Sequence, residues 1–296
     1  MEWTHWMLAS AVFLAFYDLA KKASVRENAV LPVLLCSTSC GCLAFLAAVA
    51  ACGNWRAAFD APASTIVLAL IKSTIVATSW VFTFCALKTL PISVATPIRA
   101  SAPALVFVLA FFAYGEVPSA VQGAGMAVTF AGYWAFSWAG RHEGIDFFRN
   151  RAVWCAIAGA VFSAASSLWD KFCFQVRGVP VAETQFWFQV GLVFAYGALF
   201  AGQRLLHFKH DRFEWRWTIP FTGILLACAD WLYFTGLAVP GAPVSVASLL
   251  RRFSVVITFV LGARLFREQN LKRKALALAL ILAGVTLLCL GSRAAR

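Results

Sequence analysis

The chain has 296 residues, of which 61% are hydrophobic and only 13% are charged. Soluble domains carry about 25% charged residues, so this composition excludes an ordinary soluble protein and indicates one that spans a membrane. The formal net charge of +12 does not predict a nucleic-acid partner, because the Lys and Arg residues lie mostly in short loops between apolar runs, as in inner-membrane proteins.

Apolar stretches of about 20 residues recur along the chain, and each is long enough to cross a hydrocarbon core of about 30 Å as a helix. Backbone groups find no water to bond with in lipid, so each of these spans is expected to be helical. Ten spans are predicted, in chain order at residues 3–20, 30–51, 64–87, 92–113, 119–139, 152–169, 183–202, 217–238, 244–263 and 275–291. The predicted fold is therefore an all-α integral membrane protein with ten transmembrane helices.

The two halves of the sequence repeat each other. Residues 92–116 align without gaps on residues 244–268, and eight of the 25 aligned residues are identical. We therefore predict two homologous five-helix units, residues 1–140 and residues 150–296. Because five is an odd number, the second unit enters the membrane in the opposite orientation. Inverted repeats of this kind are typical of secondary transporters.

Basic residues are distributed unevenly among the predicted loops. The odd-numbered loops hold 16 Lys and Arg residues, whereas the even-numbered loops and the two termini together hold five. By the positive-inside rule, the odd-numbered loops face the cytoplasm and both termini face outward. The expected location is the inner cell membrane, where the chain crosses the lipid bilayer several times.

Each half also carries the same short motif. A Ser-Val-Ala stretch at residues 93–95 and 245–247 is followed by a polar residue in the next turn and by a Glu that closes the helix, Glu116 or Glu268. This pattern resembles the drug/metabolite transporter superfamily, in its EamA-like branch. The resemblance implies a ten-helix bundle with a central cavity between the halves, alternating access, and export or exchange of metabolites such as amino acids or sugar phosphates. Typical members keep both termini in the cytoplasm, whereas the charge distribution of this chain predicts the opposite.

Arginines inside the predicted spans are the first candidates for a substrate site, because a charge at mid-span costs ~2.5 kcal/mol or more. Arg99 and Arg251 are aligned with each other in the repeat, and both are predicted to lie within ~5 Å of the membrane midplane. Arg252 adds a third cation, and the Arg251–Arg252 pair resembles the phosphate-binding basic pair of plastid phosphate translocators. Converging guanidinium groups suit a carboxylate or a phosphate. The alternative is a structural ion pair that holds helices together.

Two further charges lie deep in predicted spans. Asp230 is the deepest acid, and it is expected either to neutralise Arg251 or Arg252 or to act as a proton-coupling carboxylate, with pairing the favoured alternative. Lys72 is a second cation candidate for the substrate site. Its long stem also allows its ammonium group to reach the membrane interface.

Two acids lie near the ends of predicted spans. Asp18 in the first span and Asp170 in the sixth occupy similar places in the two halves, which predicts a symmetric pair of gate residues. The alternative is that both simply lie at interfacial helix ends. Asp18 and Lys22 also have the i,i+4 spacing that favours a local ion pair.

Aromatic residues complete the predicted site. Trp80 and Trp231 fall at matching places in the two halves and are expected either to form the cavity wall or to pack between helices, and Tyr17 offers a hydroxyl group. The sequence has no Walker A motif, no full set of metal ligands and no serine, histidine and carboxylate set at one membrane depth. We therefore predict no ATP drive, no cofactor, no metal and no catalytic centre.

The predicted function is secondary active transport of a small-molecule substrate by alternating access, as an exporter or exchanger. The substrate is expected to be an organic anion or an amino-acid-like zwitterion, because of the arginines at mid-span, and its transport is open to proton coupling. Two alternatives are a multidrug exporter of lipophilic cations and a flippase for a lipid-linked sugar or phosphate.

Overall fold

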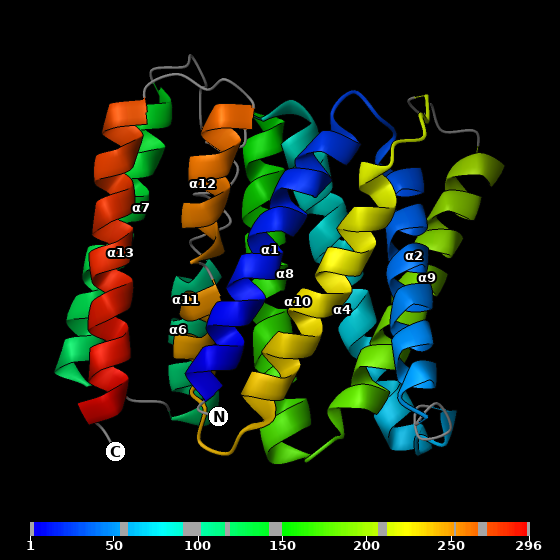
Figure 1. The fold of residues 1–296 in the computed structure, drawn as a ribbon, viewed down its shortest axis with the longest axis horizontal. Helices are drawn as coiled ribbons and strands as arrows, with labels where there is room; N and C mark the ends of the chain where they lie inside the picture. Colours follow the sequence, from blue (N-terminus) through cyan, green and yellow to red (C-terminus); the bar gives the residue numbers. More distant parts are fainter. Residues whose placement is uncertain are drawn as a thin grey trace.

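The chain folds as a bundle of helices in the computed structural model (Figure 1). The structure describes residues 3–53, 59–90, 102–115, 119–141, 150–206, 212–251, 253–265 and 271–294. Every regular element in these ranges is a helix. Five of them are long and apolar enough to cross a membrane, namely Val30–Ala51, Ala63–Thr89, Arg151–Val176, Val181–Leu205 and Thr218–Ala238.

The first half of the chain contributes five of the described helices and the second half the remainder. In the first half these are α1 (Trp3–Val25), α2 (Val30–Ala51), α4 (Ala63–Thr89), α6 (Ala102–Tyr114) and α7 (Ala120–Arg141). In the second half they are α8 (Arg151–Lys171), its π-helical continuation η1 (Phe172–Val176), α9 (Val181–Leu205), α10 (Thr218–Ala238), α11 (Val244–Arg251), α12 (Ser254–Leu265) and α13 (Leu271–Ala294). Eight of the ten predicted spans thus coincide with one α-helix each, although α1 continues five residues beyond its predicted end.

The predicted ninth span is wrong as a single helix. Residues 244–263 were expected to be continuous, but α11 ends at Arg251 and α12 begins at Ser254. Around the break the backbone N–H of Phe253 bonds to the carbonyl of Leu250 at 3.0 Å, so a tighter turn replaces the α-helical ladder. No Pro or Gly marks the break in the sequence. The predicted fourth span is described only from Ala102, since residues 91–101 lie outside the described ranges.

The helices stand side by side, with α7 and α13 paired at one edge and α2 and α9 at the other (Figure 1). Both chain termini lie at the same end of the bundle (Figure 1). From that end α1 runs to the far end, whereas α8 begins at the far end and runs back. The first helices of the two halves are therefore antiparallel.

Tight crossings join helices of the two halves. α2 crosses α10 where Gly41 meets Gly223, and a Cβ at Gly223 would overlap the carbonyl oxygen of Ser37. α9 crosses α4 where Gly191 meets Ser73, and a Cβ at Gly191 would overlap the Ser73 side chain. Small residues at such crossings let helix backbones approach closely within a membrane.

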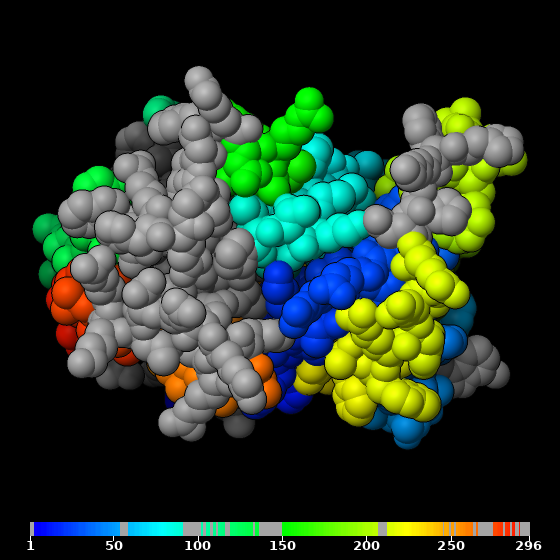
Figure 2. All heavy atoms as spheres, turned by 90° about the horizontal axis from the view of Figure 1, so that it is seen from above, coloured from blue at the N-terminus to red at the C-terminus, as the bar shows by residue number. Residues whose placement is uncertain are grey.

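In each half, a side chain near the end of the first helix donates hydrogen bonds to backbone carbonyls at or just beyond the end of another helix, α4 or α10. Lys22 Nζ donates to the carbonyls of Leu87 and Leu90 at 2.9 and 3.1 Å. Gln175 Nε2 donates to the carbonyls of Leu237 and Ala242 at 3.0 and 2.7 Å. Figure 2 shows the end of the bundle opposite the termini, where the end of α1 lies against the end of α4. Carbonyls at the ends of α4 and α10, and that of Ala242 in the connection to α11, are satisfied in this way.

Candidate functional site

A cavity of about 90 Å³ lies between α1, α4, α8, α9, α10 and α11, and it has room for several water molecules. Four charged residues line it, each from a different helix: Lys72 on α4, Asp170 on α8, Asp230 on α10 and Arg251 on α11. Serine hydroxyls and aromatic rings form most of the remaining wall. The lining is therefore polar in the interior of a largely apolar bundle.

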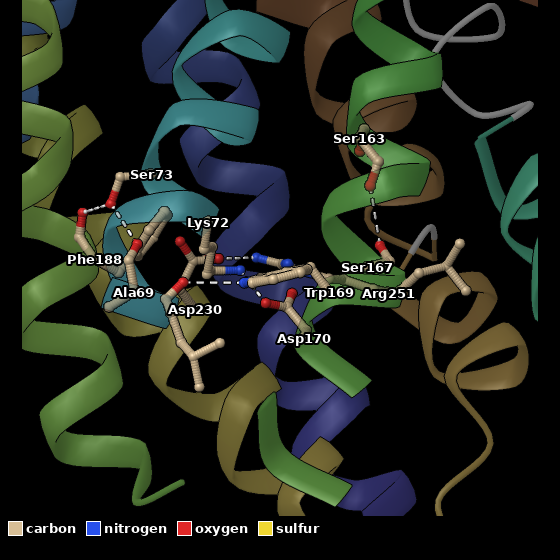
Figure 3. Close-up of polar contacts among 12 residues, drawn as sticks. Ala69, Lys72, Ser73, Ser163, Ser167, Trp169, Asp170, Phe188, Asp230 and Arg251 are labelled. Carbon is tan, nitrogen blue, oxygen red and sulfur yellow. Dashed lines mark hydrogen bonds and ion pairs between the residues drawn. The ribbon is translucent and has the colours of Figure 1, made fainter. Parts of the chain in front are cut away.

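The four charges form two ion pairs. Lys72 Nζ binds the Asp170 carboxylate, and the Arg251 guanidinium binds the Asp230 carboxylate. Figure 3 shows the four side chains converging on one point from their separate helices. The side chains of Lys72 and Asp170 are only 3% and 4% exposed, so this pair is almost fully withdrawn from solvent. The charges that line the cavity within the described residues cancel.

Aromatic faces surround the two cations. Lys72 Nζ lies 4.7 Å from the ring centre of Phe188 and 4.5 Å from that of Phe234. The Arg251 guanidinium carbon lies 4.4 Å from the ring centre of Tyr233. A desolvated cation over an aromatic face gains about 2 kcal/mol. These rings therefore help to hold the cations in place in the bundle interior.

Local helix structure places Arg251. It is the last residue of α11, and a cation is favoured at the C-terminal end of a helix. Its Nε is buried and has no hydrogen-bond partner among the described residues. The Nε–H group of Arg251 therefore remains available as a donor while the guanidinium binds Asp230.

The structure brings several of the predicted site residues together. Tyr17 and Trp80 line the same cavity as Lys72, Asp230 and Arg251. The alternative in which Asp230 neutralises Arg251 is the one present. The side chain of Lys72 turns inward, because it finds a carboxylate there, and does not extend to the interface.

Other predicted residues lie elsewhere. Trp231 packs its ring 5.5 Å from that of Phe45 on α2, and it is absent from the lining of the cavity described above. It therefore follows the helix-packing alternative. Arg99 and Arg252 lie outside the described residues, so the convergence of three arginines stays a prediction.

The spacing of Asp18 and Lys22 favoured an ion pair between them, but the structure pairs Asp18 with a different lysine. Asp18 binds Lys21, three residues on, and both side chains are buried. Lys21 Nζ also lies 4.3 Å from the ring centre of Tyr17. Lys22 points away to the carbonyls at the end of α4. Because α1 continues to Val25, Asp18 lies well inside the helix and not at its end.

Asp170 is also placed away from an interfacial helix end. It is 3% exposed, and it faces the central cavity through its bond to Lys72. Asp18 and Asp170 are thus each paired with a lysine, Lys21 and Lys72 respectively. Their role as gates stays a prediction.

Sequence reasoning missed the serines that line the cavity on α8. Ser163, Ser166 and Ser167 lie on one wall, and the hydroxyl of Ser167 donates to the backbone carbonyl of Ser163 at 3.2 Å (Figure 3). Their i, i+3, i+4 spacing places all three on the same helix face. That spacing was the available signal, because it forms a polar stripe in an otherwise apolar helix.

Comparison with known proteins bears on the family and the fold of the chain. The model of the EamA-like transporter family matches residues 1–138. The first half of the chain is thus similar to the EamA-like transporter family. A solved structure, titled only as the crystal structure of a protein, matches the fold with a TM-score of 0.74 at 19% identity and covers 100% of both chains. No curated protein sequence matches the chain.

The EamA-like match confirms the family inferred from the repeated motif. Together with the five long apolar helices, the match indicates a multi-pass membrane protein, and the family that it names consists of small-molecule transporters. The solved structure extends the likeness of fold to the second half, beyond the residues that the EamA-like model covers.

Proposed function

We propose that this EamA-like protein is a secondary active transporter of a small zwitterionic metabolite, an amino-acid-like compound with one carboxylate and one ammonium group. The observation that carries the proposal is the pair of ion pairs, Lys72–Asp170 and Arg251–Asp230, on one cavity. Two cations and two anions balance each other there. Such a site matches a ligand that also carries both charges.

A zwitterion binds this site by exchanging partners. Its carboxylate is received by Arg251, whose Nε is free of hydrogen bonds to described residues, and by the remaining donors of Lys72. Its ammonium group is received by Asp170 and Asp230, and the rings of Tyr233 and Phe234 lie close by. Every charge keeps an opposite charge beside it, so none is left uncompensated in a low dielectric, which is costly.

The proposal includes ten spans arranged as two inverted repeats, residues 1–140 and 150–296. Three observations support it: the opposite directions of α1 and α8, the matching crossings of α2 on α10 and of α9 on α4, and the matching carbonyl contacts of Lys22 and Gln175. Rocking of one repeat against the other exposes the cavity to each side of the membrane in turn. The proposed location is the inner membrane, with both termini outward by the distribution of basic residues.

An organic anion is the second candidate substrate. It is favoured by the spare donor at Arg251 Nε, together with the two further arginines, Arg99 and Arg252, in the same stretches of sequence. A lone anion that takes the place of Asp230 at Arg251 leaves that carboxylate without a counter-charge. A zwitterion supplies its own ammonium group to the displaced carboxylate, and we therefore rank it first.

Thermal unfolding of the detergent-purified chain tests the proposal with three matched ligands. These are an amino acid, the carboxylic acid that lacks its amino group, and the amine that lacks its carboxylate. A ligand that binds only the folded state raises the apparent free energy of unfolding by ~2.7 kcal/mol at a hundredfold excess over its Kd. We expect the amino acid to stabilise the protein and the other two to have little effect.

The matched variants separate binding from folding. Arg251→Gln should abolish the stabilisation by the amino acid, and the double variant Arg251→Gln with Asp230→Asn removes both charges and so leaves no unpaired ion to unfold the protein. Stabilisation by the carboxylic acid alone would favour the anion transporter. Stabilisation by the amine alone, or an unchanged response of the double variant, would refute the role given to Arg251.

A further inference from the structure

A second pocket adjoins the central cavity. Its volume is about 20 Å³, and it lies between α2, α9 and α10. Trp80, Phe188, Leu226 and Asp230 line both the pocket and the central cavity, so the two share a wall. About 10–15 Å³ suffices for one water molecule, and this pocket therefore fits a single small polar group.

Two glycines shape this side pocket. Gly41 and Gly223 belong to its lining, and they lie where α2 and α10 cross. A Cβ on Gly41 would lie 2.7 Å from the carbonyl oxygen of Gly223, closer than real Cβ contacts allow. The crossing is consequently closed by backbone, and no side chain from these two positions enters the pocket.

The side pocket presents oxygen atoms that lack a donor. Gln189 is 6% exposed, and its Oε1 has no hydrogen-bond partner among the residues described. The hydroxyls of Ser37 and Thr38 each donate to the carbonyl of Leu34, at 3.1 and 2.8 Å, so their oxygens keep free lone pairs. Buried polar atoms are normally satisfied, and an orphaned acceptor therefore indicates a missing donor.

We propose that the side pocket is a specificity subsite for a hydrogen-bond donor, a hydroxyl or amide N–H group, on the side chain of the transported zwitterion. The inference rests on the proposed function, because the charged ends of the ligand are held at the two ion pairs. Asp230 belongs to both cavities, so a ligand with its ammonium group at Asp230 has its side chain directed along the shared wall. Gln189 Oε1 accepts the donor at the end of that side chain.

Isosteric ligand pairs test the subsite on the full chain in detergent. The pairs are L-serine with L-2-aminobutyrate, L-homoserine with L-norvaline, and L-asparagine with L-leucine, which differ in polarity at similar volume. A site built to bond a hydroxyl or N–H group discriminates against an analogue that lacks it. We expect the polar member of at least one pair to bind ~10-fold more tightly, which is the gain from about one net hydrogen bond.

The variant Gln189→Leu should remove this preference while it leaves the affinity for the apolar member within ~2-fold. Gln185→Leu is the matched control, since Gln185 is also buried on α9 and lies outside the pocket lining. That variant should keep the preference. Unfolding midpoints of both variants establish that they are folded.

The possible failures can be told apart. If the zwitterions bind but the members of each pair bind alike, a water molecule fills the pocket, and the subsite is refuted while the proposed function stands. If Gln189→Leu weakens both members of a pair equally, Gln189 is only structural and the subsite is refuted. If none of the six zwitterions binds, the proposed function and the subsite fall together.

Discussion

At the scale of single residues, the account depends on charges buried in the bundle interior. The sequence predicted the four charges that line the central cavity, because a charge inside an apolar run is easily recognised, but it missed Lys21, which is buried beside Asp18. It predicted the Asp230–Arg251 pairing as one alternative, but it missed the Lys72–Asp170 pairing. Lys72 and Asp170 lie on α4 and α8, 98 positions apart, and no local spacing indicates that these two helices touch. Asp18 was misplaced for a different reason, since the apolar run stops before the helix does.

Removing one partner of the Lys72–Asp170 pair should leave a buried carboxylate without its counter-charge. We expect Lys72→Met to lower the free energy of unfolding by about 3–5 kcal/mol, because an isolated buried charge is costly. The double variant Lys72→Met with Asp170→Leu should recover most of that loss. Unfolding in detergent measures both, and a single variant as stable as the parent protein would show that the pair contributes nothing.

At the scale of helices, apolar length and loop composition predicted most boundaries well. Periodicity could not predict the break between α11 and α12, because residues 251–253 contain no Pro or Gly. A break at this position is typical of transporter binding sites, which place helix ends and freed carbonyls beside the ligand. The sequence likewise could not predict which helices cross, since Gly41 and Gly223, which meet where α2 crosses α10, are far apart along the chain.

The crossing of α2 and α10 gives a prediction with an internal control. Gly223→Ala should destabilise the protein, because the added Cβ meets the backbone of Ser37 and Gly41 and the helices must separate. The expected cost is on the order of 2–3 kcal/mol, as for overpacking in a tight core. Gly197→Ala on α9 meets nothing within 4 Å and should be neutral or stabilising by up to ~1 kcal/mol through its helix propensity. Equal stability of the two variants in detergent would contradict the packing described here.

At the scale of the whole molecule, both termini lie at one end of the bundle, and the first helices of the halves run in opposite directions. The basic residues predict that this end faces outward. A reporter that is active only in the cytoplasm, fused to the C-terminus, should therefore be silent, and one that is active only outside the cytoplasm should work. The opposite pattern would reverse the orientation and leave the cavity unchanged.

The central claim is that the cavity carries a zwitterion from one side of the membrane to the other. Counterflow in proteoliposomes tests it most directly, with a labelled amino acid outside and an unlabelled amino acid, its des-amino acid or its decarboxylated amine inside. The account predicts exchange only when the inner compound carries both charges, and none with Arg251→Gln. Equal exchange against the des-amino acid, with Arg251→Gln as active as the parent protein, would contradict it.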